Sequence, residues 1–238
     1  MKFVIGIPSF NRPKSLELLL TRLACSKGVD SVIIVADATD PLLLDRYKGV
    51  VKKVANYLND VIHDIRLGRR GSVNARNRVL ELAAQHFTDN YVLITYEDDY
   101  ICPLEDWLSP VSRWLVNGSV GVVGGRVINL SRRRVDPDFH LNFLPYMADV
   151  LTKATGFIFL DTKHGPRYVE YVTHLMAIKM SLVMKGLRYD PEYKGTGYRE
   201  ESDLQEQVRR SCYKIVSEPR FYIYHLNLDG RENRAYTM

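Results

Sequence analysis

Three consecutive acids, Glu97, Asp98 and Asp99, follow the apolar run "NYVLIT". Acids at the end of a buried strand repel one another and lose solvation, so they need a compensating positive charge. Carboxylate oxygens are the ligands that Mg²⁺ and Mn²⁺ prefer, and these ions also bind phosphate oxygens. We therefore predict a divalent metal and a diphosphate at this strand end. The alternative is a solvated acidic turn that caps a helix at "PLEDWL".

Two other segments have the chemistry of an anion site. "IPSFNRP" follows the first apolar run and offers main-chain amides and the Arg12 guanidinium to a base or a phosphate. "LGRRGSVNARN" places glycines and arginines around a predicted helix start, where free amides attract anions. Gly71 would permit close backbone approach. Arg69 and Arg70 are expected on the solvated surface.

The elements that must position these residues alternate along the first half of the chain, which predicts an α/β fold with a mostly parallel sheet flanked by helices. Strands are expected at "KFVIGI", "SVIIVA", "VIHDI" and "NYVLITY". Helices are expected after Asn11 and Pro13, after Asp40 and Pro41, and from a Ser72 cap to about Gln85. Ligands bind beyond the carboxyl ends of such strands, so the loop at residues 8–12, Asp37 and the three acids should converge.

The second half is less regular. Strands are expected at "VGVVGGRVINL", "TGFIFLD" and "RYVEYVTHLMAI", a loop at "SRRRVDPDFH", and a helix over "LQEQVRRSC". No repeat or Gly/Ser-rich linker divides the chain, so we predict a single domain over residues 1–238. Its nucleotide-binding half would cover about residues 1–119, and its acceptor-binding half about residues 120–238.

Composition limits the class of protein. The 238 residues are 46% hydrophobic and 26% charged, with a net charge of +5 that favours phosphorylated ligands. No apolar run is long enough for a membrane span, and the N-terminus does not resemble a signal peptide, so we expect a cytoplasmic protein. Cys25, Cys102 and Cys212 are too scattered for a zinc site or a disulfide framework. The basic stretches lack interleaved aromatic residues, and no nucleic-acid partner is expected.

Five segments together resemble the GT-A-fold glycosyltransferases of family 2, which are inverting, metal-dependent enzymes that use nucleotide-diphosphate sugars. The segments are "IPSFNRP", "VADATD", "RRGSVNARN", "YEDDYICPLEDWL" and "GLRYDPEYKGTGYREESDLQEQVRR". The resemblance implies a donor site, which we assign to Pro8, Ser9, Asn11, Arg12, Asp37, Gly71, Arg76, Asn77 and Asp98. It implies Mn²⁺ or Mg²⁺ held by Asp99, with Glu97 and His225 as further ligands. Asp37 resembles the residue that contacts the base, and Asp98 the one that contacts the ribose or sugar.

Inverting transfer needs one carboxylate to take the proton of the acceptor hydroxyl. In "GYREESDL", Glu201 aligns with the family's base and Glu200 precedes it, although the family usually has Asp at the second position. The alternative is that these acids only stabilise the helix dipole. Asp203 could orient an acceptor. His174 could do the same, and the alternative for His174 is a place in the core. Arg209 and Arg210 could reach a phosphate, although an exposed helix face is the default interpretation.

The expected donor is UDP- or GDP-linked, and the acceptor carries a hydroxyl. Arg132, Arg133 and Arg134 permit a peripheral membrane contact, although a solvated loop is the alternative. Two other functions remain open from the sequence. One is a nucleotidyltransferase that acts on a sugar phosphate. The other is a catalytically degenerate protein that binds a nucleotide or RNA.

Overall fold

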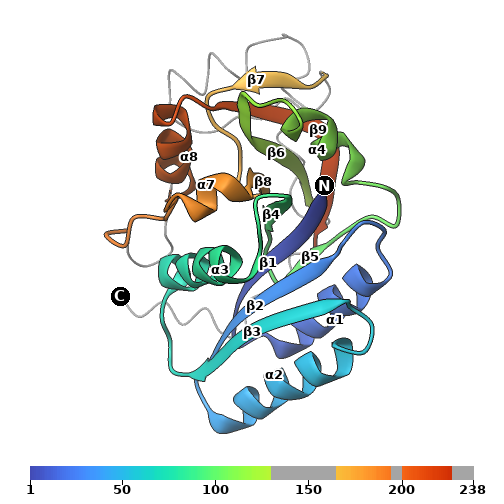
Figure 1. Ribbon diagram of the computed structural model, residues 1–238. Coiled ribbons are helices and arrows are strands. Elements are labelled where there is room, and N and C mark those ends of the chain that lie inside the picture. Colours follow the sequence, from blue (N-terminus) through green and yellow to red (C-terminus); the bar gives the residue numbers. More distant parts are fainter. Residues whose placement is uncertain (130–164, 194–199, 227–238) are drawn as a thin grey trace.

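The computed structural model describes residues 1–129, 165–193 and 200–226. Strands and helices alternate through the first half of the chain (Figure 1). The order is β1 (Lys2–Phe10), α1 (Pro13–Ala24), β2 (Ser31–Ala38), α2 (Pro41–Val54), β3 (Asp60–Leu67), α3 (Ser72–His86) and β4 (Tyr91–Thr95). The four strands predicted in this half are confirmed, as are the three helices between them.

The second half adds strands to the same sheet. Its described elements are β5 (Tyr100–Ile101), α4 (Ser109–Leu115), β6 (Val120–Asn129), β7 (Arg167–Val169), β8 (Met176–Lys179), α7 (Met180–Met184), α8 (Glu200–Arg210) and β9 (Lys214–His225). The strand order is β3-β2-β1-β4-β8-β6-β9-β5, with β7 paired to β9. β1 is parallel to β2 and β4, whereas β8 is antiparallel to β4 and β6. One sheet therefore joins the two predicted halves, and their division of labour stays a prediction.

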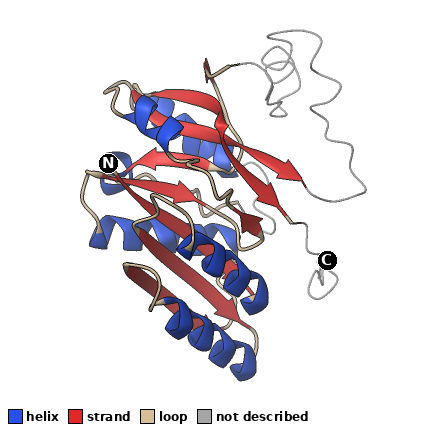
Figure 2. Ribbon diagram, turned by 90° about the vertical axis from the view of Figure 1, so that its right-hand side faces the viewer, coloured by secondary structure: helices blue, strands red, loops and turns tan. Residues whose placement is uncertain are grey.

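Helices cover both faces of the sheet, as the turned view shows (Figure 2). Successive side chains of a strand point to opposite faces, and β1 follows this rule. Ile5 and Ile7 pack in the hydrophobic cluster that contains α1, α2 and α4 residues. Val4 packs in the second cluster, with α3, α7 and α8 residues. Each fully buried aliphatic side chain of this kind stabilises the fold by about 1.5–3 kcal/mol.

Local sequence explains where the helices begin. Pro13 and Pro41 stand at the first turn of α1 and α2, where their fixed φ suits a helix and no amide is lost. The Asp40 carboxylate accepts a hydrogen bond from the Leu43 amide at 2.9 Å, as its predicted cap role requires. The predicted Ser72 cap is wrong. Gly71, with φ of +86°, holds the cap position of α3, and Ser72 is already helical.

The second half differs from expectation in detail. The strand expected at "VGVVGGRVINL" is β6, which is described to Asn129 and has an irregular register between Gly124 and Arg126. "RYVEYVTHLMAI" contains two separate strands, β7 and β8, and the helix expected over "LQEQVRRSC" is α8, which ends at Arg210. β9 was not predicted. "TGFIFLD" and "SRRRVDPDFH", with Arg132, Arg133 and Arg134, lie outside the described residues. Within those residues, every helix is too short or too polar to cross a bilayer.

Candidate active site

Arg12 joins the ends of β1 and β4. Its guanidinium lies 2.7 Å from Oδ1 of Asp98 and 2.8 Å from Oδ2 of Asp99. The main-chain amide of Asn11 donates to the carbonyl of Asp37 at 3.1 Å, which brings the end of β2 to the same place. The predicted convergence of these loops at the carboxyl edge of the sheet is therefore confirmed.

Asp98 is fully buried beneath this edge. The Ser9 hydroxyl donates to its Oδ2 at 2.6 Å, and Ser9 also lies 2.7 Å from the Tyr47 hydroxyl. Burial raises the pKa of Asp98 to about 7, against the opposing effects of the Arg12 charge and the Ser9 hydrogen bond. Ser9 and Asp98 therefore form a buried network that fixes the loop carrying Arg12.

Asp99 faces the end of β9. His225 Nε2 lies 3.3 Å from Asp99 Oδ2, and the His225 ring packs edge-on against Tyr100 with centroids 5.3 Å apart. Burial alone would raise the pKa of Asp99, but the hydrogen bond from His225 and the charge of Arg12 lower it below its usual value. This acid therefore favours the ionised form in which it can bind a cation.

Arg76 is the centre of a second charged cluster, 15% exposed at its side chain. Its guanidinium contacts Glu97 at the end of β4 and Glu200 at the start of α8. It also lies 3.3 Å from Oε1 of Glu201. Burial would lower the pKa of Arg76, but the charges of Glu97 and Glu201 raise it. Arg76, which is predicted to bind the donor, thus contacts three protein carboxylates. Glu97 belongs to this cluster rather than to the Asp99–His225 pair.

The two acids at the start of α8 differ in exposure. The Glu200 side chain is 0% exposed, and its Oε1 accepts from the Ser72 hydroxyl at 3.4 Å. The Glu201 side chain is 20% exposed. Only Glu201 can therefore meet a ligand without rearrangement of the core, while Glu200 ties α8 to α3.

Asp37 is 3% exposed and binds an arginine that was expected at the surface. Its carboxylate accepts from the Arg70 amide at 2.6 Å and from Arg70 Nε at 2.7 Å. The Arg70 side chain is only 7% exposed and also contacts Asp64 at 3.1 Å. The expectation of a solvated Arg70 is wrong, because the β2–β3 pairing places two carboxylates beside it. Arg69 packs over the Phe10 ring, 4.8 Å from its centroid.

Residues 4–177 match the model of glycosyl transferase family 2. The chain belongs to this family. No curated protein matches the sequence. The match includes the first four motifs of the predicted resemblance, and the fifth, at residues 186–210, lies beyond it.

Solved structures show the same fold. One is TarS 1-349 from S. aureus in complex with UDP-GlcNAc, at 17% identity and a TM-score of 0.68, covering 97% of this chain and 60% of that one. Another is the mannosyltransferase PcManGT from Pyrobaculum calidifontis in complex with GDP-Man and Mn²⁺, at 16% identity and a TM-score of 0.65, covering 96% and 58%. This family 2 chain therefore spans about 60% of the length of these proteins. The predicted GT-A fold is confirmed.

Other residues considered for the site of this family 2 chain make contacts within the fold. The Asn77 side chain donates from Nδ2 to the Tyr189 carbonyl and accepts at Oδ1 from the Tyr189 amide, both at 2.8 Å. The nitrogen and the oxygen of its side-chain amide are therefore both hydrogen-bonded. Asp203 accepts from Gln207 at 2.9 Å within α8. Arg209 and Arg210 pair with Glu206 on an exposed face of α8, the default that their sequence suggested.

The carboxyl edge of the sheet, where Arg12, Asp99 and His225 meet, is called the rim below. His174 and Pro8 line a small cavity beneath it, beside Arg76 and Glu97. The His174 ring stacks on Tyr100 with centroids 5.5 Å apart. Burial lowers the pKa of His174 below its usual value, against the opposing charge of Glu97. His174 is therefore neutral at pH 7 and packs between the rim and the second half of the family 2 fold. Its place there suits either a core role or an acceptor contact.

Asp99 and His225 are the two residues of the rim that could hold a divalent metal. Asp99 supplies an oxygen and His225 a nitrogen within 3.3 Å of it. In the described ranges, no group of three or more His, Cys, Asp or Glu side chains is placed to hold a metal ion. Ions such as Mg²⁺ are commonly bound by one or two carboxylates together with substrate phosphates and water. Two ligands are therefore enough when a diphosphate is present.

Proposed function

We propose that this chain transfers a glycosyl group from a nucleotide-diphosphate sugar to an acceptor hydroxyl, with inversion at the anomeric carbon. The observation that carries the proposal is the meeting of Asp99, His225 and Arg12 at one edge of the sheet. Family membership supports the reaction class, because the matched residues 4–177 include the loops that carry Arg12 and Asp99. The donor diphosphate would lie there.

Asp99 and His225 would hold Mn²⁺ or Mg²⁺, whose charge stabilises the diphosphate as it leaves. Imidazole suits Mn²⁺ better than Mg²⁺, so we favour Mn²⁺. Arg12 would add a second positive charge from the β1 loop, once the diphosphate competes for its guanidinium. Ser9 and the buried Asp98 hold that loop in place.

Glu201 would act as the general base. It removes the proton of the acceptor hydroxyl while that oxygen attacks the anomeric carbon from the side opposite the diphosphate. Its partial exposure supports this role over Glu200, which is fully buried. Arg76 contacts both acids and Glu97, so it would orient the Glu201 carboxylate.

The donor is proposed to be UDP- or GDP-linked. The neighbouring structures contain UDP-GlcNAc in TarS and GDP-Man with Mn²⁺ in PcManGT. Pro8, Asn11, Asp37 and Gly71 would contact the nucleotide base and the phosphates. Because Arg70 already binds the Asp37 carboxylate, the nucleotide base would contact this ion pair rather than a free carboxylate.

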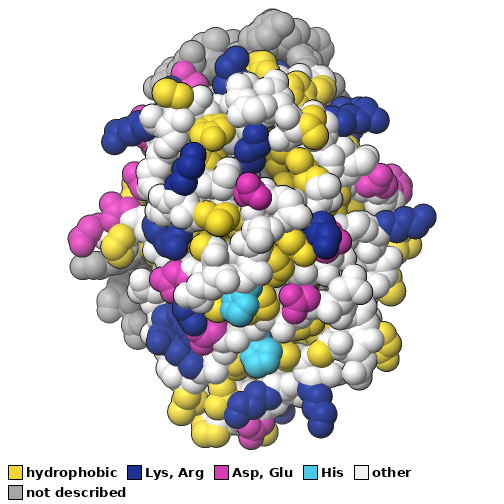
Figure 3. Space-filling view, viewed as in Figure 1, with side chains coloured by type: hydrophobic (Ala, Val, Ile, Leu, Met, Phe, Trp, Pro, Cys, Tyr) yellow, Lys and Arg dark blue, Asp and Glu magenta, His cyan; other side chains and the backbone are white. Residues whose placement is uncertain are grey.

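Figure 3 supports a small-molecule donor over a nucleic acid. Lys and Arg side chains on this face alternate with Asp and Glu, without a broad positive stripe. Nucleic-acid binding relies on clustered positive charge that neutralises many phosphates. The cytoplasmic location of the protein and its peripheral membrane contact remain predictions.

Product analysis tests the reaction class. The protein is incubated with UDP-N-acetylglucosamine, UDP-glucose or GDP-mannose and Mn²⁺, and the released nucleotide is identified by chromatography. Release of nucleoside diphosphate, by transfer or by slow hydrolysis, is the expected result. A nucleotidyltransferase would instead consume nucleoside triphosphate and sugar phosphate with release of pyrophosphate. That result would overturn the proposal.

A further inference from the structure

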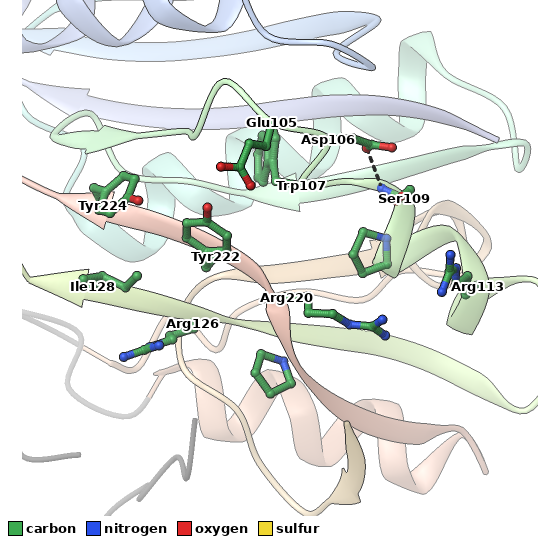
Figure 4. Close-up of a pocket in the computed structure, with 12 residues that line it drawn as sticks. Glu105, Asp106, Trp107, Ser109, Arg113, Arg126, Ile128, Arg220, Tyr222 and Tyr224 are labelled. Carbon is green, nitrogen blue, oxygen red and sulfur yellow. Dashed lines mark hydrogen bonds between the residues drawn. The ribbon is translucent and has the colours of Figure 1, made fainter. Parts of the chain in front are cut away.

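A groove of about 550 Å³ lies outside the rim, over the neighbouring strands β6 and β9 (Figure 4). The loop before α4 and the first turns of α4 form its other wall. Its volume falls in the range of sites that bind small ligands, about 300–1,000 Å³. None of the residues given a role at the rim lines this groove.

Two tyrosines of β9 form the floor of the groove. Tyr222 and Tyr224 share one face of the strand, while Phe221 and Ile223 point into the core. The two tyrosine rings lie 5.7 Å apart in an edge-on arrangement, and Ile128 of β6 lies beside them. Figure 4 shows both hydroxyls pointing to the side where Glu105 lies. An aromatic face with a polar edge matches a sugar ring, which has C–H faces and a hydroxyl rim.

The polar wall of the groove carries charges of both signs. Glu105 and Asp106 stand among Arg113, Arg126 and Arg220. Arg220 is already paired with the buried Glu218, through contacts of 2.9 Å from Nε and Nη2. Planar carboxylates and guanidinium groups form hydrogen bonds with hydroxyl groups in fixed geometry. A wall with charges of both signs favours a neutral polyhydroxyl ligand over a polyanion.

The floor of the groove follows β9 and ends beside the proposed metal-binding pair. From Arg220 to Tyr224 the strand extends about 13 Å at the usual rise per residue, which is longer than one sugar ring. Tyr224 pairs with Ile101 of β5 and directly precedes His225. Alternation along β9 turns Tyr224 away from the His225 side, so a ligand in the groove would lie beside the rim and not in it.

We propose that this groove binds a neutral oligosaccharide segment through Tyr222, Tyr224 and Glu105. The segment would belong to the acceptor, at a distance from the hydroxyl that receives the new sugar, and in this respect the inference rests on the proposed function. The binding itself is independent of the nucleotide site.

The test is a titration of the whole chain with neutral trisaccharides of glucose, mannose, galactose and N-acetylglucosamine, followed by saturation-transfer NMR and calorimetry. At least one trisaccharide should bind, and Tyr222→Ala should weaken that binding at least tenfold. Glu105→Ala removes an exposed side chain without disturbing the core and should also weaken it. Tyr57→Ala, which removes a tyrosine that is 69% exposed outside the groove, is the matched control and should bind as the wild type does.

Thermal shifts with nucleoside diphosphates, measured on the same samples, keep the two proposals separate. Oligosaccharide binding that Tyr222→Ala and Glu105→Ala weaken, with nucleotide shifts unchanged, supports the groove. Absence of trisaccharide binding to the wild type, or binding that survives both substitutions, overturns the groove assignment whatever the nucleotide result. Loss of nucleotide shifts alone would count against the proposed function and leave the groove assignment standing.

Discussion

His225 Nε2 lies 3.3 Å from Asp99 Oδ2, so the last described strand returns to the acidic segment that follows β4. This pair is the basis of the proposed metal site. We expect Asp99→Asn to abolish metal-dependent activity while the fold is kept, because the side chain lies at the rim. Donor turnover is measured against Mn²⁺ concentration, with Asp89→Asn in an exposed loop as the control. Full activity of Asp99→Asn would contradict the metal assignment.

The acids at the start of α8 should separate by function. We expect Glu201→Gln to lower the transfer rate by about 10²–10⁴-fold, the usual contribution of a general base, with donor binding retained. Glu200→Gln is the matched neighbour and should act mainly on stability, because Glu200 is buried against Arg76. Rates and donor affinities of both variants decide the matter. An unchanged rate in Glu201→Gln would move the base elsewhere.

Much of this arrangement could be predicted from local sequence. β1, β2 and β4 are continuous apolar runs that end in polar loops, and parallel strands bring such ends together. The Asp40 cap was also visible, because an Asp-Pro pair has a known place at a helix start.

The errors have physical causes that lie outside local sequence. In β9 the polar residues 217–220, which include Pro219, separate two apolar runs, so one continuous strand depends on pairing with β6. The contact of Arg70 with Asp37 depends on the register of β2 and β3, and that of Arg76 with Glu201 on the docking of α8. The contact of Asn77 with Tyr189 likewise depends on tertiary structure, and its donor-binding role stays a prediction.

Arg76 should be important for stability as well as activity. Replacing it with Met leaves the carboxylates of Glu97, Glu200 and Glu201 close together without their cation. Removal of one partner from a buried ion pair costs about 3–5 kcal/mol, and we expect a loss of this order in the free energy of unfolding. Urea unfolding measures it. Arg209→Met, on the exposed face of α8, is the control and should change stability by less than about 1 kcal/mol. Equal losses would contradict a special role for Arg76.

Asp64 gives the fold a dependence on acid. Hydrogen bonds from Arg70 and Arg78 outweigh partial burial and lower its pKa. A carboxyl whose pKa is lower in the folded state stabilises the protein above its unfolded pKa of about 4, and this contribution is lost as pH falls through the folded value. Because the side chain is partly exposed, we expect less than about 1 kcal/mol.

Asp64→Asn should therefore reduce the free energy of unfolding at pH 7 and have a smaller effect at pH 3. Asp60→Asn, exposed on the same strand, is the control and should change little at either pH. Urea unfolding at both pH values provides the comparison. If Asp64→Asn lowers the free energy of unfolding by the same amount at pH 7 and at pH 3, the charge of Asp64 does not explain its contribution to stability.

The central claim is that the rim binds a nucleoside diphosphate through a metal. Its most direct test is a thermal-shift panel of UDP, GDP, CDP, ADP and dTDP, each with Mn²⁺, with Mg²⁺ and with EDTA. Because a ligand that binds only the folded state raises the melting temperature, UDP or GDP should stabilise the protein with Mn²⁺ and lose this effect with EDTA. No shift with any nucleotide, or an equal shift in EDTA, would contradict the account.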